Sequence, residues 1–206
     1  MTFTVRKRND WIFKITKIAG SPFLSALFRT KREGAAFLPQ KEGFILLPKH
    51  QRWEDIPLLA LATPRPLTFV AKSELFTTQV KAWFIASLGG IPLNRTHPME
   101  SRQSLRAMMG LLKEGEGVVV FPEGTYYRNR VGPGRPGLVR MIGSRFPGPF
   151  VPVGINYRRE VPRTRVLIRF GRPLYSEPGV SPQAFLEEIM TAIGRLSDLH
   201  HTGGPG

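Results

Sequence analysis

A histidine and an aspartate five positions apart are the residues of this chain best suited to carry out a reaction. His50 follows the apolar run of residues 44–47, and Asp55 comes next after a short polar stretch. Histidine titrates near neutral pH, so its imidazole can take a proton and return it. An aspartate within hydrogen-bond reach would fix the tautomer of the ring and stabilise the imidazolium. No serine or cysteine nucleophile is required when a substrate hydroxyl attacks, so the pair points to acyl transfer.

Short apolar runs that alternate with helical periodicity indicate the elements that position this pair. Strands or short extended segments are predicted at residues 44–47, 66–70, 91–93, 118–121, 150–156 and 165–170. Helices are predicted at residues 55–62, 74–87 and 138–144, and from Pro98 and Ser181 onward. Strands separated by helices imply an α/β fold, a single layered domain whose buried mixed sheet is covered by helices.

The charge balance indicates an anionic partner. Thirty basic residues against fifteen acidic ones give a net charge of +15, a field that attracts nucleic acid, an acidic membrane surface or phosphorylated substrates. The basic residues gather in two groups, at 6–32 and at 158–172. The chain has no cysteine, which excludes disulfides, thiolate metal sites and a cysteine nucleophile.

Residues 1–35 are predicted to form a basic, amphipathic helical segment. Its apolar runs, at 11–18 and 22–28, are far shorter than the roughly 20 apolar residues of a membrane span. Trp and Phe flanked by Lys and Arg suit helices that lie in a membrane interface; packing on the protein's own core is the alternative. We therefore expect a membrane-associating segment (1–35), a catalytic domain (36–199) and a loose tail (200–206).

Four blocks of the chain, in order, resemble motifs of the lysophospholipid acyltransferase family, which includes 1-acyl-glycerol-3-phosphate acyltransferases. The blocks are the HxxxxD segment His50–Asp55, Gly90–Arg95, Phe121–Thr125 and Val151–Ile155. The stretch Lys72–Phe76 also looks like the lysine-bearing segment between the first two motifs of the family. A lone HxxxxD arises often by chance, whereas four blocks in register are specific.

The resemblance implies an O-acyltransferase of phospholipid biosynthesis that moves a fatty acyl chain from an acyl thioester to the free hydroxyl of a lysophospholipid. His50 would be the general base, and Asp55 would accept its other N–H. The donor would be acyl-CoA or acyl carrier protein, with no further cofactor and no metal. The enzyme would sit as a peripheral protein on an anionic membrane surface, at its cytoplasmic face. The alternative, a basic module that binds nucleic acid or anionic membranes without catalysis, does not explain the four blocks.

The implied acceptor and phosphate contacts lie in the later blocks. They are Arg95, Glu123, Gly124, Thr125, Lys72 and Arg128. Arg95 can hold a phosphate in a bidentate way that lysine cannot. Gly124 would permit close backbone approach, and Glu123 would either contact polar groups of the acceptor or hold the basic residues around it.

Four positions depart from the family pattern, and one of them is Asn94, which stands where the second block often has Asp. Lys49 stands where Asn commonly precedes the histidine, and Arg52 stands where Ser is common. Tyr126 stands where members that act on lysophosphatidic acid commonly have a phosphate-binding arginine. Arg128 or Arg52 are the candidate substitutes for that arginine, so the acceptor is either lysophosphatidic acid or another hydroxyl-bearing lysolipid.

Overall fold

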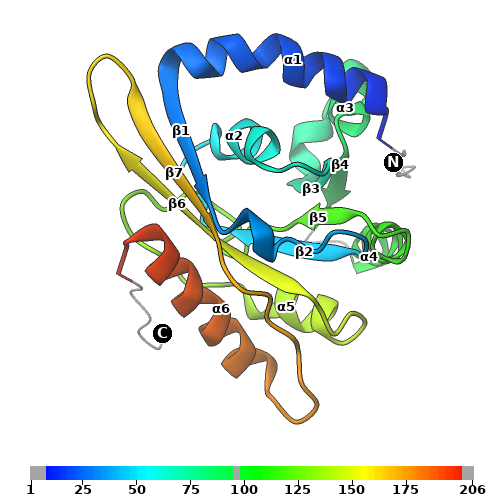
Figure 1. The fold of residues 1–206 in the computed structure, drawn as a ribbon. Coiled ribbons are helices and arrows are strands. Elements are labelled where there is room, and N and C mark those ends of the chain that lie inside the picture. The colour runs from blue at the N-terminus through cyan, green and yellow to red at the C-terminus, as the bar shows by residue number, and fades with distance from the viewer. Residues whose placement is uncertain (1–7, 95–97, 201–206) are drawn as a thin grey trace.

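A seven-stranded mixed sheet forms the centre of the computed structural model, which describes residues 8–94 and 98–200 (Figure 1). The strands are β1 (Phe28–Glu33), β2 (Phe44–Pro48), β3 (Leu67–Lys72), β4 (Gly90–Leu93), β5 (Gly117–Val119), β6 (Phe150–Arg158) and β7 (Thr164–Phe170), in the order β1-β7-β6-β2-β5-β3-β4. All neighbours pair in parallel except β6 and β7, which form an antiparallel hairpin. The predicted α/β fold with a buried mixed sheet is confirmed.

Helices cover both faces of this sheet. The helices are α1 (Asp10–Leu27), α2 (Asp55–Ala62), α3 (Gln79–Ser87), α4 (Pro98–Lys113), α5 (Pro136–Gly143) and α6 (Pro182–Ser197), with short 3-10 helices η1 (Ala35–Phe37) and η2 (Ser73–Phe76). The helices α1 and α2 pack over one face, and α4, α5 and α6 pack over the other. The short helix α3 lies beside the edge strand β4 and the start of α1.

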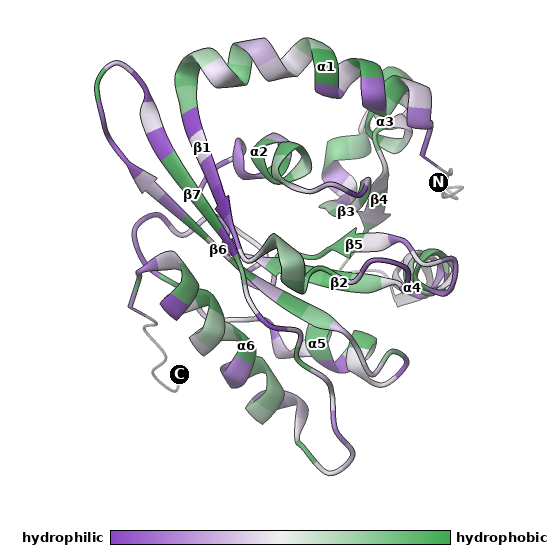
Figure 2. Ribbon diagram, in the orientation of Figure 1, coloured by the Kyte–Doolittle hydropathy of each residue, from purple (hydrophilic) through white to green (hydrophobic). Residues whose placement is uncertain are grey.

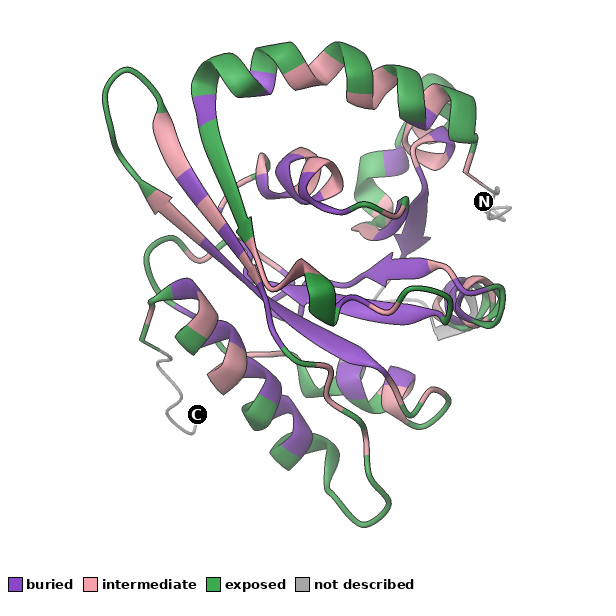
Figure 3. Ribbon diagram, viewed as in Figure 1, coloured by how far each residue is buried: buried purple, intermediate pink, exposed green. Residues whose placement is uncertain are grey.

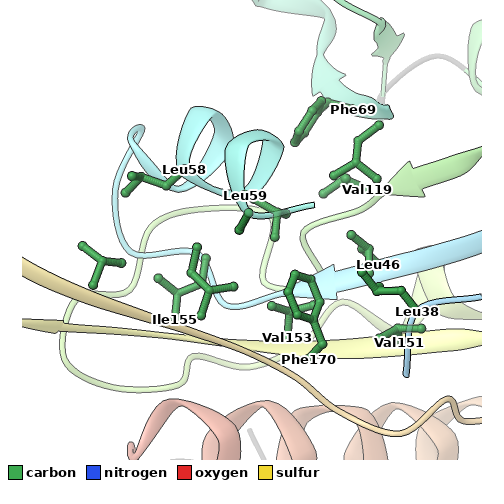
Figure 4. Packing of buried hydrophobic residues seen from close by; sticks show 14 of the residues in the cluster. Leu38, Leu46, Leu58, Leu59, Phe69, Val119, Val151, Val153, Ile155 and Phe170 are labelled. Atoms are coloured by element: carbon green, nitrogen blue, oxygen red, sulfur yellow. The ribbon is translucent and has the colours of Figure 1, made fainter. Parts of the chain in front are cut away.

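The core has two halves because successive side chains of a buried strand point to opposite faces of the sheet. In β2, Leu46 joins the half beneath α1 and α2, whereas Ile45 and Leu47 join the half beneath α4, α5 and α6. Leu58 and Leu59 of α2 pack toward the sheet in the first half (Figure 4). The strands β2 and β5 are buried throughout, and β6 is buried over its first six residues (Figure 3).

The helix α1 presents one face to the core and another to solvent. Its N-cap Asn9 accepts the backbone N–H groups of Trp11 and Ile12, and Phe13 and Leu24 are buried. Large apolar side chains of α1 nevertheless remain exposed: Trp11, Ile15, Ile18, Phe23 and Leu27. Within residues 8–94 and 98–200, no helix combines the length and apolar character that crossing a membrane requires.

The prediction of helix throughout residues 1–35 is wrong at its end, because residues 28–33 form the edge strand β1. Five of its six side chains are polar (Figure 2), and only Phe28 is buried. Backbone pairing with β7 defines this strand, so no apolar alternation marks it in the sequence. Of the predicted tail (200–206), His200 is described and its carbonyl accepts the N–H of Val131, whereas residues 201–206 lie outside the described residues.

The predicted helix over residues 74–87 is divided into η2 and α3, which Thr78 separates. The Thr78 hydroxyl caps α3 by accepting the N–H of Lys81. Most of the large apolar side chains of this segment are exposed, because α3 lies beyond the edge strand rather than over the sheet. The exposed side chains are Leu75, Val80, Trp83 and Phe84.

Gly154 of β6 packs tightly against α6, because an added Cβ would overlap the backbone of Leu196. We expect Gly154→Ala to lower the free energy of unfolding by about 1–3 kcal/mol, because an overpacked core must shift its backbone. The matched control is Gly110→Ala in α4, which has open space at this position and should gain about 0.5–1 kcal/mol. Urea unfolding measures the free energy of unfolding of both variants. Equal changes in the two would contradict the tight packing at Gly154.

Candidate active site

The ends of several parallel strands meet at one edge of the sheet, and the candidate residues follow them. His50 comes after β2, residues 121–125 come after β5, and Lys72 ends β3. Since β2, β3, β5 and β6 run in the same direction, their carboxyl ends lie at a common edge, where α/β proteins form their sites.

His50 and Asp55 are hydrogen-bonded. Nδ1 of His50 lies 3.1 Å from Oδ2 of Asp55, and this carboxylate is fully buried at the first turn of α2. The same oxygen accepts the backbone N–H groups of Gln51 at 2.6 Å and Arg52 at 2.8 Å. Because an ionised carboxylate only accepts hydrogen bonds, the ring proton lies on Nδ1. The neutral ring therefore carries its free lone pair on Nε2.

Tyr157 of β6 is a fourth partner of Asp55, and nothing in its spacing from the motifs marks it in the sequence. Its hydroxyl donates to Oδ1 of Asp55 at 2.6 Å. Burial, and then the Asp55 charge, raise the pKa of Tyr157 well above its usual value, so the hydroxyl keeps the proton it donates. The Arg52 guanidinium lies over the Tyr157 ring, 4.6 Å from its centroid. Asp55 is thus held in place from α2, the loop before it and β6.

Lys49 and Glu123 form a fully buried ion pair directly behind His50. Nζ of Lys49 lies 2.9 Å from Oε1 and 2.8 Å from Oε2 of Glu123, and it also donates to the carbonyls of His50 and Tyr127. Glu123 in turn accepts the backbone N–H groups of His50 and Gly132. Burial lowers the pKa of Lys49, which the Glu123 charge opposes. Of the two roles considered for Glu123, the one seen is holding a basic residue, Lys49.

A loop over residues 123–132 closes the site and is anchored to the histidine segment. The N–H of Tyr127 donates to the carbonyl of His50 at 2.9 Å. Gln51 ties this loop to the sheet, because it accepts the N–H of Asn129 and donates to the carbonyl of Ile155. Gly124 has φ +68°, a left-handed conformation that strongly favours glycine.

The His50 ring lines a cavity of about 270 Å³, which we call the catalytic cleft. The ring stacks on Phe121 with 3.8 Å between centroids, and it lies 4.3 Å from the Tyr126 ring. Burial, then Asp55, raises the pKa of Tyr126, so its hydroxyl stays protonated. The cleft therefore has an aromatic wall where the family pattern predicts arginine.

The structure places three of the six residues implied as acceptor contacts at the catalytic cleft. Lys72, Gly124 and Thr125 line the catalytic cleft. Arg128 is exposed in the closing loop, and it is not among the residues that line the cleft. Arg95 lies outside the described residues.

A second cavity, of about 310 Å³, lies between α1 and α2; we call it the apolar cavity. Its lining is mostly apolar and comprises Phe13, Thr16, Lys17, Gly20, Leu24, Trp53, Ile56, Pro57, Ala60, Leu61, Phe69 and Leu88. Nζ of Lys17 donates to the carbonyl of Thr63, and burial, then Arg32, lowers the pKa of Lys17. Ile56 and Phe69 also line the catalytic cleft, so the two cavities adjoin.

Comparison with known proteins connects this geometry to one family. The sequence profile of the acyltransferase family matches residues 29–156, the range that holds His50, Asp55, Lys49 and Glu123 but not α1. A 1-acyl-sn-glycerol-3-phosphate acyltransferase of Streptococcus pneumoniae is 31% identical over 142 residues, which cover 66% of this chain and 51% of that protein. A lyso-ornithine lipid O-acyltransferase of Pseudomonas aeruginosa is 31% identical over 163 residues, which cover 72% and 60%.

A solved structure shares the fold. The crystal structure of the 1-acyl-sn-glycerophosphate acyltransferase of Thermotoga maritima has a TM-score of 0.72, covering 92% of this chain and 80% of that chain at 22% sequence identity. The chain spans about half the length of the curated relatives it matches.

Removing one charge of the Lys49–Glu123 pair should destabilise the protein far more than removing both. We expect Lys49→Met to lower the free energy of unfolding by about 3–5 kcal/mol, because Glu123 becomes an uncompensated buried charge. Lys49→Met with Glu123→Gln should recover most of that loss, since both charges are then absent. Lys31→Met, which breaks the exposed pair with Glu33, is the control and should change little. Equal losses in the single and double variants, measured by urea unfolding, would refute the pairing.

Proposed function

This chain belongs to the acyltransferase family, and on that premise we propose that it transfers a fatty acyl chain from an acyl thioester to the free hydroxyl of a lysophospholipid. The observation that carries this proposal is the hydrogen bond between Nδ1 of His50 and Asp55 at the catalytic cleft. That bond leaves Nε2 of His50 free to act as the general base.

The proposed reaction needs no acyl-enzyme intermediate. Nε2 of His50 takes the proton of the acceptor hydroxyl as its oxygen attacks the thioester carbonyl. The tetrahedral intermediate collapses by breaking the C–S bond, and the thiolate takes the proton back from His50. The products are a diacyl lipid and a free thiol. Asp55 stabilises the imidazolium between these steps, and the bond from Tyr157 keeps its carboxylate aligned.

The apolar cavity is proposed to hold the acyl chain. It adjoins the catalytic cleft through Ile56 and Phe69, so a chain whose carbonyl lies beside His50 can extend between α1 and α2. Burial of each methylene there contributes about 0.8 kcal/mol. The donor would be acyl-CoA or acyl carrier protein.

The acceptor is proposed to be 1-acyl-glycerol-3-phosphate or a related lysolipid. Lys72 at the cleft supplies a cation for an anionic head group, with Arg95 and Arg128 as further proposed contacts. Tyr126 gives an aromatic wall beside His50 in place of a phosphate-binding arginine. The names of two relatives span both options, a glycerol phosphate acceptor and a lyso-ornithine lipid.

The protein is proposed to act as a peripheral enzyme on the cytoplasmic face of an anionic membrane. The exposed apolar side of α1, with Trp11 78% and Ile18 73% exposed, suits insertion into the interface. The net charge of +15 would strengthen that attraction.

The direct test is an assay of thiol release from long-chain acyl-CoA and from acylated acyl carrier protein, with a panel of lysolipids that includes lysophosphatidic acid and lyso-ornithine lipid. Wild type should release thiol only when an acceptor is present. His50→Ala should lower kcat/KM by about 10²–10⁴. The proposal would be refuted if folded protein released no thiol with any donor and acceptor, or if the His50→Ala variant were fully active.

Gly20 offers a test of where the acyl chain lies. It lines the apolar cavity, and a Cβ added at this position would meet no atom within 4 Å. We expect Gly20→Leu to shift the preference toward shorter acyl-CoA, with about a fourfold loss per methylene that no longer fits. The matched control is Ala19→Leu on the exposed side of α1. An unchanged chain-length profile in Gly20→Leu, measured over an acyl-CoA series, would exclude this cavity as the acyl site.

A further inference from the structure

The tip of the β6–β7 hairpin lies beside the end of α1. Phe28, the residue after α1, pairs with Thr164 at the start of β7. Nη1 of Arg163 also donates to the carbonyl of Ser25 in α1 at 3.1 Å. Figure 1 shows the hairpin tip and α1 on the same side of the molecule, away from α6. Hairpin and helix therefore present neighbouring surfaces to the same surroundings.

This tip combines positive charge with an apolar end. Four arginines lie at residues 158–165, namely Arg158, Arg159, Arg163 and Arg165. Glu160, the one acidic residue of the segment, faces Arg165 at 3.8 Å, which leaves a positive excess. Arg29 of β1 lies in register with Arg165 and adds to it. At the turn itself, Val161 is 94% exposed.

Exposed valine among arginines matches the chemistry of an anionic lipid surface. Arginines are attracted to anionic headgroups, and an apolar tip gains by leaving water. The neighbouring α1 exposes large apolar side chains, among them Trp11, Ile15 and Ile18, which a bilayer can cover. An acidic protein or a nucleic acid would match the arginines but would leave these apolar side chains in water.

We propose that the β6–β7 hairpin is a second membrane contact, which places Val161 among the headgroups of an anionic bilayer beside α1. This inference rests on the proposed function, in which the acceptor reaches the enzyme from the membrane. A single helix in the interface leaves the protein free to roll about the helix axis. A second contact, off that axis and at the end of α1, fixes the rotation. The apolar cavity beneath α1 would then have a fixed orientation relative to the bilayer.

The lack of native cysteine permits a site-specific test. Val161→Cys is labelled with the fluorophore NBD in the otherwise unchanged chain. The matched control is Val180→Cys, an exposed valine in the loop before α6, which packs on the other face of the sheet. The vesicles contain phosphatidylglycerol and phosphatidylcholine in equal parts, or phosphatidylcholine alone.

The label at position 161 should brighten severalfold and shift to the blue with the anionic vesicles, and nitroxide-bearing lipids should quench it. The label at position 180 should not respond. A water-like signal at position 161, while the protein still sediments with the vesicles, overturns the hairpin contact and leaves α1 as the anchor. If the label at position 161 responded to acyl carrier protein but not to vesicles, the membrane contact would be overturned, and the hairpin would instead be a binding surface for the acyl donor.

Charge reversal tests the arginines independently. Arg158→Glu with Arg159→Glu should weaken binding to the anionic vesicles by at least about tenfold. The control is Arg102→Glu with Arg106→Glu, which makes the same change in net charge on the exposed side of α4. If both double variants bound the anionic vesicles equally weakly, net charge alone would explain the effect, and the inference would be overturned. Thiol release from a water-soluble short-chain thioester is measured in parallel, so that failure of catalysis is separated from failure of membrane contact.

Discussion

The Asp55 carboxylate is the point at which the loop, the helix and the sheet of the site are joined. It is fully buried and accepts hydrogen bonds from the His50 ring, two backbone N–H groups and the Tyr157 hydroxyl. A buried charge is tolerated only when its hydrogen bonds are made, so the histidine segment has little freedom to move. The position of His50, the proposed base, therefore follows from the hydrogen bonds that Asp55 accepts.

A second buried charge supports the other side of the histidine. The Lys49–Glu123 pair holds both the N–H and the carbonyl of His50, and it ties them to the loop that closes the site. Tyr157 links Asp55 to β6, and Glu123 follows β5, so both buried carboxylates connect the end of β2 to neighbouring strands. Support of this kind suits general base catalysis, because the proton must be taken at a fixed distance.

The parts of the site that are close in sequence were predictable, and the parts that meet across the sheet were not. His50 and Asp55 are joined by one strand-to-helix turn, so their spacing alone brings them within reach. Tyr157 is 102 positions from Asp55 and Glu123 is 74 from Lys49, and no local pattern reports such contacts. Lys49 looked like a departure from the family pattern, but it is the partner of Glu123. Apolar periodicity predicted the buried strands well, yet it missed polar β1 and could not tell that the apolar side of α3 faces solvent.

The central claim, that Asp55 fixes His50 with a free Nε2, is tested most directly by ¹⁵N NMR of the histidine rings. The chain has four histidines, and the His50→Gln variant assigns the signal of interest. At a pH where the ring is neutral, we expect the tautomer with its proton on Nδ1 and an unprotonated Nε2. A proton on Nε2 would contradict it, because the nitrogen required as the base would then have no lone pair to accept the acceptor's proton.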